Sequence, residues 1–437
     1  MLPPNVPFAS SPSTEGVPRK RLLLLFTTTG YNAQDFVAAA AKLDIELVFG
    51  TDRCHVLDDP WRDGAIPVHF HRPAQAVRSI LERLQSQPIH GVVAIGDKAT
   101  LVAAFVSKAL GLPHNSLKAV QACRNKFYCR RLFQKAGLPV PGFRCYGLGE
   151  DPAEIARHIR FPCVLKPLSR SASQGVIRAD SILEFEEAFR RICTLLRSPE
   201  VQQSGDSSNE HILVEDFIEG SEVALEGILR RGELRVLALF DKPDPLNGPF
   251  FEETLYVTPS RLPHDLQREI ELGTQQAADV LGITEGPIHA ELRITSSGPR
   301  ILEVAARSIG GLCSRTLRFG TGMSLEEIIM RHALDLPGHV PQREQQAAGV
   351  MMIPIPKSGF LERVTGLEAA RVIAGIEEVT ITAKLGQKLV PLPEGSSYLG
   401  FIFSRGETPA SVETALRRAH QQLHFDILPS LEVVLNQ

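Results

Sequence analysis

Short apolar runs alternate with segments of helical spacing in the first third of the chain. The runs at residues 22–26, 45–49 and 91–95 have the length and composition of strands that are buried on both faces. Segments of helical spacing follow these runs, and Gly96-Asp97 introduces one of them. This alternation predicts βαβ units with a parallel sheet, in which the loops that follow the strands share one edge.

The pattern changes at residues 136–142, where Ala-Gly-Leu-Pro-Val-Pro-Gly stops a helix and marks a linker. After it we expect strands at 162–166, 211–215, 222–240 and 349–354, helices at 182–196, 262–281 and 412–423, and a hairpin made of 288–294 and 300–307. The chain should therefore be an α/β and α+β multidomain protein. Its predicted parts are a disordered tail at 1–18, an α/β domain at 19–117, a smaller subdomain with its connecting helix at 118–218, a larger subdomain at 219–340 and a C-terminal α+β segment at 341–437.

Composition narrows the class of protein. A chain of 437 residues is long enough for about two to four domains, and 43% hydrophobic residues are enough for packed cores. The net charge of −3 predicts neither a nucleic-acid surface nor a membrane patch, and the run at 22–26 is too short to span a bilayer. Seven cysteines without a CxxC pair are best explained as reduced thiols, which predicts a cytoplasmic protein.

Two carboxylates in the predicted hairpin are candidates for a metal site. Glu291 and Glu303 lie among aliphatic residues, where a carboxylate is costly unless it pairs or binds a cation. Hard oxygen ligands suit Mg²⁺, which commonly bridges carboxylates to nucleotide phosphates. A cross-strand salt bridge with Arg293 or Arg307 is the alternative. We expect His289 to face away from Glu291 and to be a packed histidine rather than a ligand.

A lysine at a strand end is a candidate phosphate contact. Lys166 precedes a loop of small hydroxyl residues at 167–175, whose N–H groups and hydroxyls can donate to phosphate oxygens. A solvated lysine before an ordinary turn is the alternative. The strand that contains Glu215 runs out toward Glu222 and offers backbone groups that could read an adenine ring. Its alternative is an edge strand with solvated acids.

Taken in order, these motifs resemble the ATP-grasp superfamily. The order is Lys126, Lys166 with its loop, the segment 215–222, Glu291, Glu303 and Arg307. The similarity is greatest to carboxylate–amine ligases of the L-amino acid ligase and carnosine synthase type, and it covers nearly everything from Arg21 onward. It implies an ATP-grasp fold behind an N-terminal Rossmann-like, parallel-sheet (pre-ATP-grasp) domain at 19–117, with the small ATP-grasp subdomain at 118–218 and the large one at 219–340.

The resemblance implies that named side chains bind ATP. Those expected at the phosphates are Lys126, Lys166 and Ser173, and those expected at adenine and ribose are Glu215, Phe217, Ile218 and Glu222. Glu291 and Glu303 would bind Mg²⁺, with Mn²⁺ as the other option. Arg307 and Lys166 would be catalytic at the γ-phosphate and at an acyl phosphate.

The implied reaction passes a carboxylate through an acyl phosphate to an amine. The expected partners are therefore a small-molecule carboxylate and an amine, and a homodimer is a common assembly for proteins of this type. The residues expected to border these substrates are Glu253, Arg307, Gly310, Gly311 and Arg315. Glu253 would pair with a substrate ammonium, or else belong to a strand with two exposed acids.

The sequence departs from the family pattern at two places. Ala305 stands where many members have an asparagine that binds metal. Arg170 and Ala172 lie in the loop after Lys166, which the resemblance implies is a flap over the phosphates, at positions where glycines are common. Two other functions stay open: a carboxylase or phosphoribosylamine-type ligase of the same superfamily, and a nucleotide-binding module without turnover.

Overall fold

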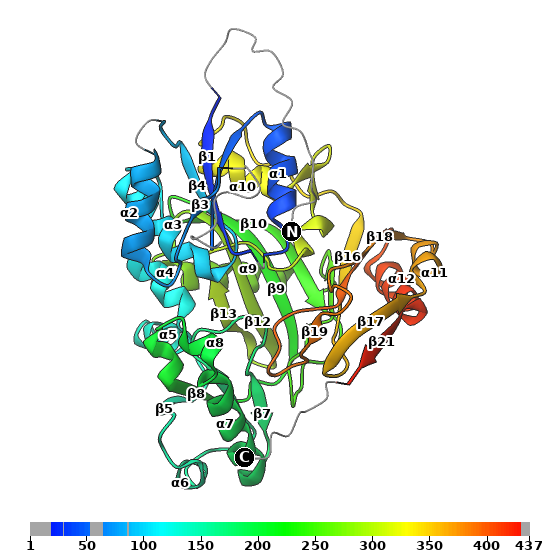
Figure 1. The fold of residues 1–437 in the computed structure, drawn as a ribbon. Coiled ribbons are helices and arrows are strands. Elements are labelled where there is room, and N and C mark those ends of the chain that lie inside the picture. Colours follow the sequence, from blue (N-terminus) through cyan, green and yellow to red (C-terminus); the bar gives the residue numbers. More distant parts are fainter. Residues whose placement is uncertain (1–18, 29, 53–63, 85–86, 430–437) are drawn as a thin grey trace.

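A computed structural model describes residues 19–28, 30–52, 64–84 and 87–429, so the tail predicted at 1–18 lies outside the described residues. Figure 1 shows the N-terminal domain above a large central sheet, a smaller sheet below it, and the C-terminal strands and helices at one side. No helix in the described part of the chain combines the length and the apolar character needed to cross a membrane.

The N-terminal domain is the parallel βαβ arrangement that the sequence pattern predicts. Its strand order is β3-β2-β1-β4, and each pairing is parallel. Leu22, Leu23, Leu24 and Leu25 are fully buried, as expected for a strand covered on both faces. The elements are β1 (Arg21–Phe26), α1 (Ala33–Lys42), β2 (Glu46–Thr51), β3 (Ile66–Pro67), α2 (Pro73–Leu84), β4 (Gly91–Ala94) and α3 (Asp97–Ala109).

Two short helices connect this domain to the rest of the molecule. Ser116 caps α4 (Leu117–Arg124) and Asn125 caps α5 (Lys126–Lys135), because each side chain accepts a backbone N–H of the first turn. The cap at Asn125 makes Lys126 the first helical residue. Arg130 lies four residues later and therefore on the same face of α5.

The smaller sheet follows the linker and has the strand order β5-β8-β6-β7. Because β8 lies between two partners, it is not the edge strand that one interpretation of its sequence predicted. Ser181 caps helix α7, because its hydroxyl accepts from the Glu184 N–H, and the helix buries Phe185 and Phe189 against the sheet. The elements are β5 (Phe143–Gly147), α6 (Pro152–Ala156), β6 (Cys163–Pro167), β7 (Ile177–Ala179), α7 (Ile182–Leu196), α8 (Pro199–Gln202), the 3₁₀ helix η1 (Ser207–Glu210) and β8 (His211–Asp216).

The central sheet has the strand order β13-β12-β9-β10-β11-β16-β20-β18, and its described pairings are antiparallel. Helix α9 packs on this sheet at β13 and β10, and its Ile270 and Ala277 belong to the same buried hydrophobic cluster as Val223 and Ile288. The elements are β9 (Ser221–Arg230), β10 (Glu233–Lys242), β11 (Leu255–Thr258), α9 (His264–Leu281), β12 (Gly286–Thr295), β13 (Gly298–Ala305), β16 (Ala347–Ile353), β18 (Ile376–Ile381) and β20 (Gly400–Gly406).

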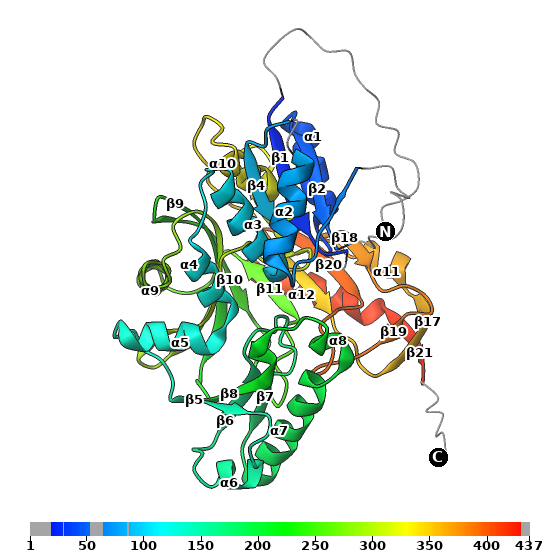
Figure 2. The ribbon, with the colours of Figure 1, turned by 60° about the vertical axis from the view of Figure 1, so that its left-hand side comes forward.

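Three strands of the C-terminal segment, β16, β18 and β20, are part of this sheet, and its other strands form a separate three-stranded sheet. The boundary expected at 340 falls between β11 and β16, which pair directly, and α12 packs on β16 and β20 (Figure 2). Helix α10 packs on α1 and β4 and ties the sheet to the N-terminal domain. The remaining elements are η2 (Cys313–Thr316), β14 (Arg318–Phe319), β15 (Met323–Ser324), α10 (Leu325–Ala333), β17 (Gly359–Thr365), α11 (Leu367–Arg371), β19 (Lys388–Leu389), α12 (Pro409–Gln422) and β21 (His424–Leu428).

A buried charge cluster joins α5 to both sheets. Arg130 of α5 lies 2.6 Å from Glu215 of β8 and donates to the Leu302 carbonyl of β13 at 2.9 Å, while Lys166 of β6 contacts the other oxygen of Glu215. Burial alone would raise the pKa of Glu215, but the Arg130 guanidinium and the Lys166 ammonium lower it to about 2. Glu215 is therefore an anion that fixes the positions of two buried cations.

Replacing Glu215 with glutamine tests this cluster. Glutamine keeps the shape of the side chain but leaves Arg130 and Lys166 buried without a counter-charge. We expect Glu215→Gln to lower the free energy of unfolding by about 3–5 kcal/mol at pH 7, measured by urea denaturation. Glu154→Gln, which breaks the exposed Arg157–Glu154 pair, is the matched control and should cost less than about 1 kcal/mol.

The stability difference between the wild type and Glu215→Gln should depend on pH. The pKa of Glu215 is lowered from an ordinary value of 4.5 to about 2, so its stabilising contribution is complete above about pH 4.5 and is lost as the pH falls toward 2. The difference between the wild type and Glu215→Gln should shrink over that interval. A difference that stays constant down to pH 2 would contradict the ionised state of Glu215.

Candidate functional site

One cleft gathers most of the residues that the sequence pointed to. It lies between the smaller sheet and the central sheet and encloses about 950 Å³, including the part that is open to solvent. Helix α5 and the loop at 170–173 also contribute to its walls. The predicted residues that line it are Lys126, Lys166, Ser173, Glu215, Phe217, Ile218, Glu222, Glu253, Glu291, Glu303 and Arg307.

Two lysines line the cleft from different elements. Lys166, near the end of β6, is 8% exposed and contacts Glu215, so it is not the solvated lysine of the alternative interpretation. The Lys126 ammonium lies 3.1 Å from Glu303 Oε2 and donates to the Arg170 carbonyl at 2.7 Å. Two ammonium groups that are held in one cleft suit a ligand with several anionic oxygens.

Glu291 and Glu303 are direct partners in the register of β12 and β13. Their side chains are 25% and 30% exposed, so both reach the cleft from a mostly buried setting. A register shift follows at once and leaves Leu302 as the extra residue of a β-bulge. Burial raises the pKa of Glu291, and so do the carboxylates of Glu222 and Glu303. A divalent cation would relieve this repulsion, so the pair fits Mg²⁺.

The arginines that could have neutralised this pair have other partners. Arg293 lies 3.2 Å from Glu222, and Arg307 lies 3.0 Å from Asp97. The cross-strand salt bridge with Arg293 or Arg307 is therefore not the arrangement that the structure shows.

The expected orientation of His289 was wrong. His289 and Glu291 are two residues apart, and the period of a strand places such residues on the same face. The His289 Nε2 lies 3.4 Å from Glu291 Oε1, and its Nδ1 lies 3.1 Å from Glu226 Oε2, which is fully buried. His289 is packed, as expected, but it lines the cleft opposite Ala305, its register partner.

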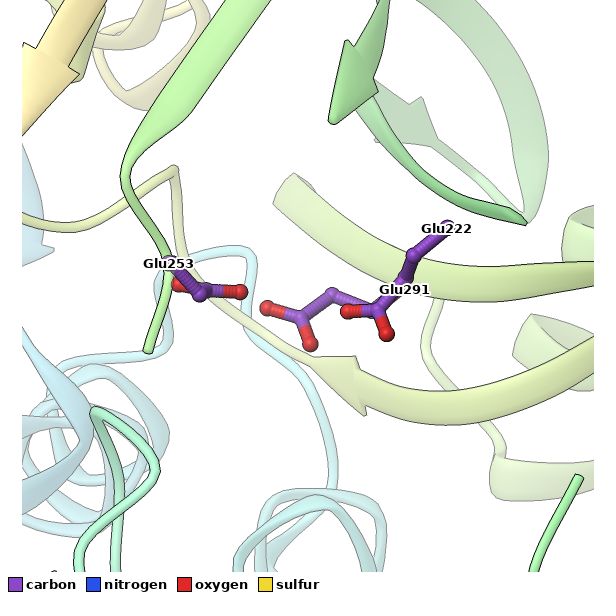
Figure 3. A group of neighbouring side chains, drawn as sticks. All are labelled: Glu222, Glu253 and Glu291. Atoms are coloured by element: carbon purple, nitrogen blue, oxygen red, sulfur yellow. The ribbon is translucent and has the colours of Figure 1, made fainter. Parts of the chain in front are cut away.

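Three carboxylates of the cleft share one buried ammonium. Figure 3 shows Glu222 of β9, Glu291 of β12 and Glu253, from the segment before β11, lying close together, and their oxygens lie within 4.8 Å of one another. The Lys242 ammonium lies 2.7 Å from Glu222 and 3.5 Å from Glu291, and it contacts Glu253. Lys242 already supplies a positive charge to this trio, just as the Lys126 ammonium, 3.1 Å from Glu303, supplies one to the pair of Glu291 and Glu303.

The charge states around Lys242 follow from these contacts. Burial would lower the pKa of Lys242, but the three carboxylates raise it well above its ordinary value. Burial raises the pKa of Glu253 to about 7, with a further contribution from Glu291 and an opposing one from Lys242. Glu253 is only 15% exposed, so it is not one of two exposed acids on a strand.

Aromatic and cationic side chains form the wall near Phe217. The guanidinium groups of Arg178 and Arg293 lie over its ring, 4.2 Å and 4.9 Å from the centroid, and Phe251 stacks at 6.4 Å. The Arg293 side chain is fixed in this position, because it donates to the Ile218 carbonyl at 2.6 Å. The Phe217 ring is therefore held between cationic and aromatic neighbours beside the cleft.

The end of the loop at 170–175 is held by the C-terminal segment. The Gly175 N–H donates to the Pro393 carbonyl at 2.7 Å, and the Gln174 amide donates to the Glu394 carbonyl at 2.7 Å. Ala172 and Ser173 both have φ of +54°, a region that favours glycine. The C-terminal segment therefore borders the flap that the sequence predicted.

Three of the predicted substrate residues are not part of the lining of this cleft. The Arg315 guanidinium lies 3.0 Å from Asp35 and 2.9 Å from Glu378, so it joins the N-terminal domain to the central sheet. Gly311 has φ of +62°, and a Cβ there would meet Phe401 at 2.9 Å. Gly310 is exposed. The structure gives these three residues structural or surface positions.

Several residues that contact or line the cleft were not assigned a site role from the sequence, although two of them carried a usable signal. Lys242 ends an apolar strand, which is the feature that identified Lys166. Asp97 follows the carboxyl end of β4, where loops of a parallel sheet carry functional groups. Arg130 and Arg293 have no comparable local signal, because their partners lie 85 and 71 positions away in the chain.

Comparisons with known proteins find similar families along much of the chain. Three family descriptions match successive parts of the chain: the ATP-grasp N-terminal domain at 37–114, the ATP-grasp domain at 159–316 and the L-amino acid ligase C-terminal domain 2 at 351–427. The crystal structure of L-amino acid ligase from Bacillus licheniformis superposes with a TM-score of 0.80 at 26% identity, covering 94% of this chain and 99% of that one.

Two curated relatives extend the comparison. Dapdiamide A synthase of Enterobacter agglomerans is 27% identical over 54% of this chain and 54% of its own length. The L-arginine-specific L-amino acid ligase of Bacillus subtilis is 23% identical over 77% of this chain and 80% of its own length. The match thus spans about half of the synthase and most of the ligase. Together with the cleft, these similarities show an ATP-grasp domain at 159–316 in a chain that resembles the L-amino acid ligases over most of its length.

Proposed function

We propose that the protein is an ATP-dependent carboxylate–amine ligase that joins two small molecules, one of them an amino acid or a related acid, through an amide bond. The observation that carries the proposal is the convergence of two lysines, a cross-strand pair of carboxylates and an arginine on one cleft. This set supplies what phosphoryl transfer requires, namely alignment and neutralisation of charge.

The lysines and the flap would hold the nucleotide. Lys126 and Lys166 would contact its phosphates, and Ser173 lies in the loop that covers them. Adenine would lie against the wall of Phe217 and Ile218 beside Glu215, and Glu222 would accept from the ribose. Glu291 and Glu303 would hold Mg²⁺, or Mn²⁺ in its place, which when bound offsets the charge of the phosphates.

Arg307 and Glu253 would serve the two substrates. The substrate carboxylate would attack the γ-phosphate beside Arg307, with ADP as the leaving group, and the amine would then displace phosphate from the acyl phosphate. A fixed guanidinium stabilises the charge that develops in both steps. Glu253, at the other side of Glu291, would bind an ammonium group. The covered cleft would keep water from hydrolysing the acyl phosphate.

The setting of the protein is also part of the proposal. The described cysteines carry free thiols, which supports a cytoplasmic protein. A homodimer, common among proteins that this chain resembles, is one assembly that the proposal allows. The C-terminal match to the L-amino acid ligases favours this function over a carboxylase or a phosphoribosylamine-type ligase, and the retained lysines and carboxylates favour it over a module without turnover.

A screen of substrate pairs tests the function. We expect ADP to form from ATP and Mg²⁺ when a suitable carboxylate and amine are both present, with the amide product detected by mass spectrometry. Pairs of amino acids are the first set, and single acids and bicarbonate are the controls. ADP formation with bicarbonate alone would indicate the carboxylase alternative. Binding of ATP without turnover in any pair would indicate the non-catalytic alternative.

Removing a metal carboxylate tests the site. We expect Glu303→Ala to lower kcat by roughly 100-fold or more, because the charge on the phosphates is then poorly offset. The melting temperature should change little, since the side chain is 30% exposed. Glu271→Gln, on the exposed face of α9, is the control and should leave kcat unchanged. Normal turnover in Glu303→Ala would refute the metal assignment.

A further inference from the structure

Two arginine–aspartate pairs join the segment after β13 to the N-terminal domain. Arg307 pairs with Asp97, the first residue of α3, and Arg315 pairs with Asp35 of α1. The pairs differ in one respect, because Arg307 lines the cleft and Arg315 does not. The structure therefore contains a functional pair and a matched structural pair between the same two parts.

The Asp97 side chain holds Arg307 in a bidentate arrangement. The Arg307 Nε donates to Asp97 Oδ1 and one terminal nitrogen donates to Asp97 Oδ2, both at 3.0 Å. The other terminal nitrogen donates to the Ser308 carbonyl at 3.0 Å. A guanidinium has five N–H donors. Three are engaged here, so the plane of the group is fixed while two donors keep their capacity for a ligand in the cleft.

The backbone around Asp97 is fixed as well. Gly96 precedes it with φ of +76°, a conformation that favours glycine, and begins α3 directly after β4. The Thr100 hydroxyl donates to the Asp97 carbonyl at 2.7 Å. Burial alone would raise the pKa of Asp97, but Arg307 lowers it below its ordinary value, so Asp97 is an anion at neutral pH.

We infer that Asp97 is a positioning residue, through which the N-terminal domain orients Arg307 toward the phosphoryl group that is transferred. The inference rests on the proposed function for the role of Arg307, and it gives that domain a part in the reaction. Because a carboxylate behind the guanidinium already fixes its orientation in the folded protein, little entropy is lost in orienting it during the reaction.

Kinetics of Asp97→Asn test the inference. Asparagine keeps the size of the side chain but removes its charge and one acceptor. We expect kcat to fall on the order of 10–100-fold with KM for ATP changed less than about twofold. Asp35→Asn breaks the matched pair and should leave kcat within about twofold. In an Arg307→Ala background, Asp97→Asn should cause little further loss, since both changes act through one group.

A binding measurement separates this inference from the proposed function. By calorimetry with Mg²⁺, we expect Asp97→Asn to weaken the ATP analogue AMPPNP several-fold relative to ADP, which lacks the γ-phosphate, and Asp35→Asn to leave that ratio unchanged. This test needs no substrate pair, so it stands even if the screen finds none. If Asp97→Asn does not fold, Asp97→Glu is measured in its place. It keeps the charge but moves the carboxylate, so its ratio of AMPPNP to ADP affinity should fall less than a loss of the carboxylate would cause, and should still lie below that of the wild type.

The outcomes that would overturn the inference are equally definite. An unchanged ratio and an unchanged kcat in Asp97→Asn would show that the pair is structural. A rise in kcat would show that Asp97 restrains Arg307 from the reaction. Equal losses in Asp97→Asn and Asp35→Asn would show that contact between the domains matters, and not the orientation of Arg307.

Discussion

Compensation of buried charge is the constraint on which the cleft depends. Glu215 sits between Arg130 and Lys166, and Lys242 sits among three carboxylates. Each group would be costly to bury alone, since desolvation of a single ion exceeds the gain from most contacts. Because the partners come from different elements, the elements can pack in this way only when every charge meets its counterpart. The contacts that fix how these elements pack against one another therefore also place the charged side chains of the cleft.

Local pattern predicted much of the fold. The helix expected at 182–196 is observed with those bounds, and Asp97 begins α3 after the strand as expected. Periodicity and turn chemistry act over a few residues, so elements of this kind can be read from neighbouring positions. The boundary expected at 340 could not be read in that way, because the pairing of β11 with β16 joins strands that are far apart in the chain.

The site divides along the same line. Lys166, Glu291 and Glu303 were found because a charge at a strand end, or within an apolar strand, is unusual in itself. Arg307 was found, but its partner was not, because Asp97 lies 210 positions earlier. His289 was misplaced by an error about strand period and not by a missing signal. A candidate charged residue can thus be recognised from the sequence around it, while its partner can be known only from the fold.

Helix α5 shows how the two halves of the cleft are kept in register. Lys126 and Arg130 share one face of this helix, and Lys126 contacts Glu303 while Arg130 holds Glu215. Arg130 also donates to the carbonyl of Leu302, the bulged residue next to Glu303. One rigid turn therefore sets the spacing between the lysine of β6 and the carboxylates of β12 and β13. Ala305 has no side-chain oxygen that could bind a metal ion, so in the proposed function this spacing and the charge of Lys126 would contribute more to holding the phosphates beside Glu291 and Glu303.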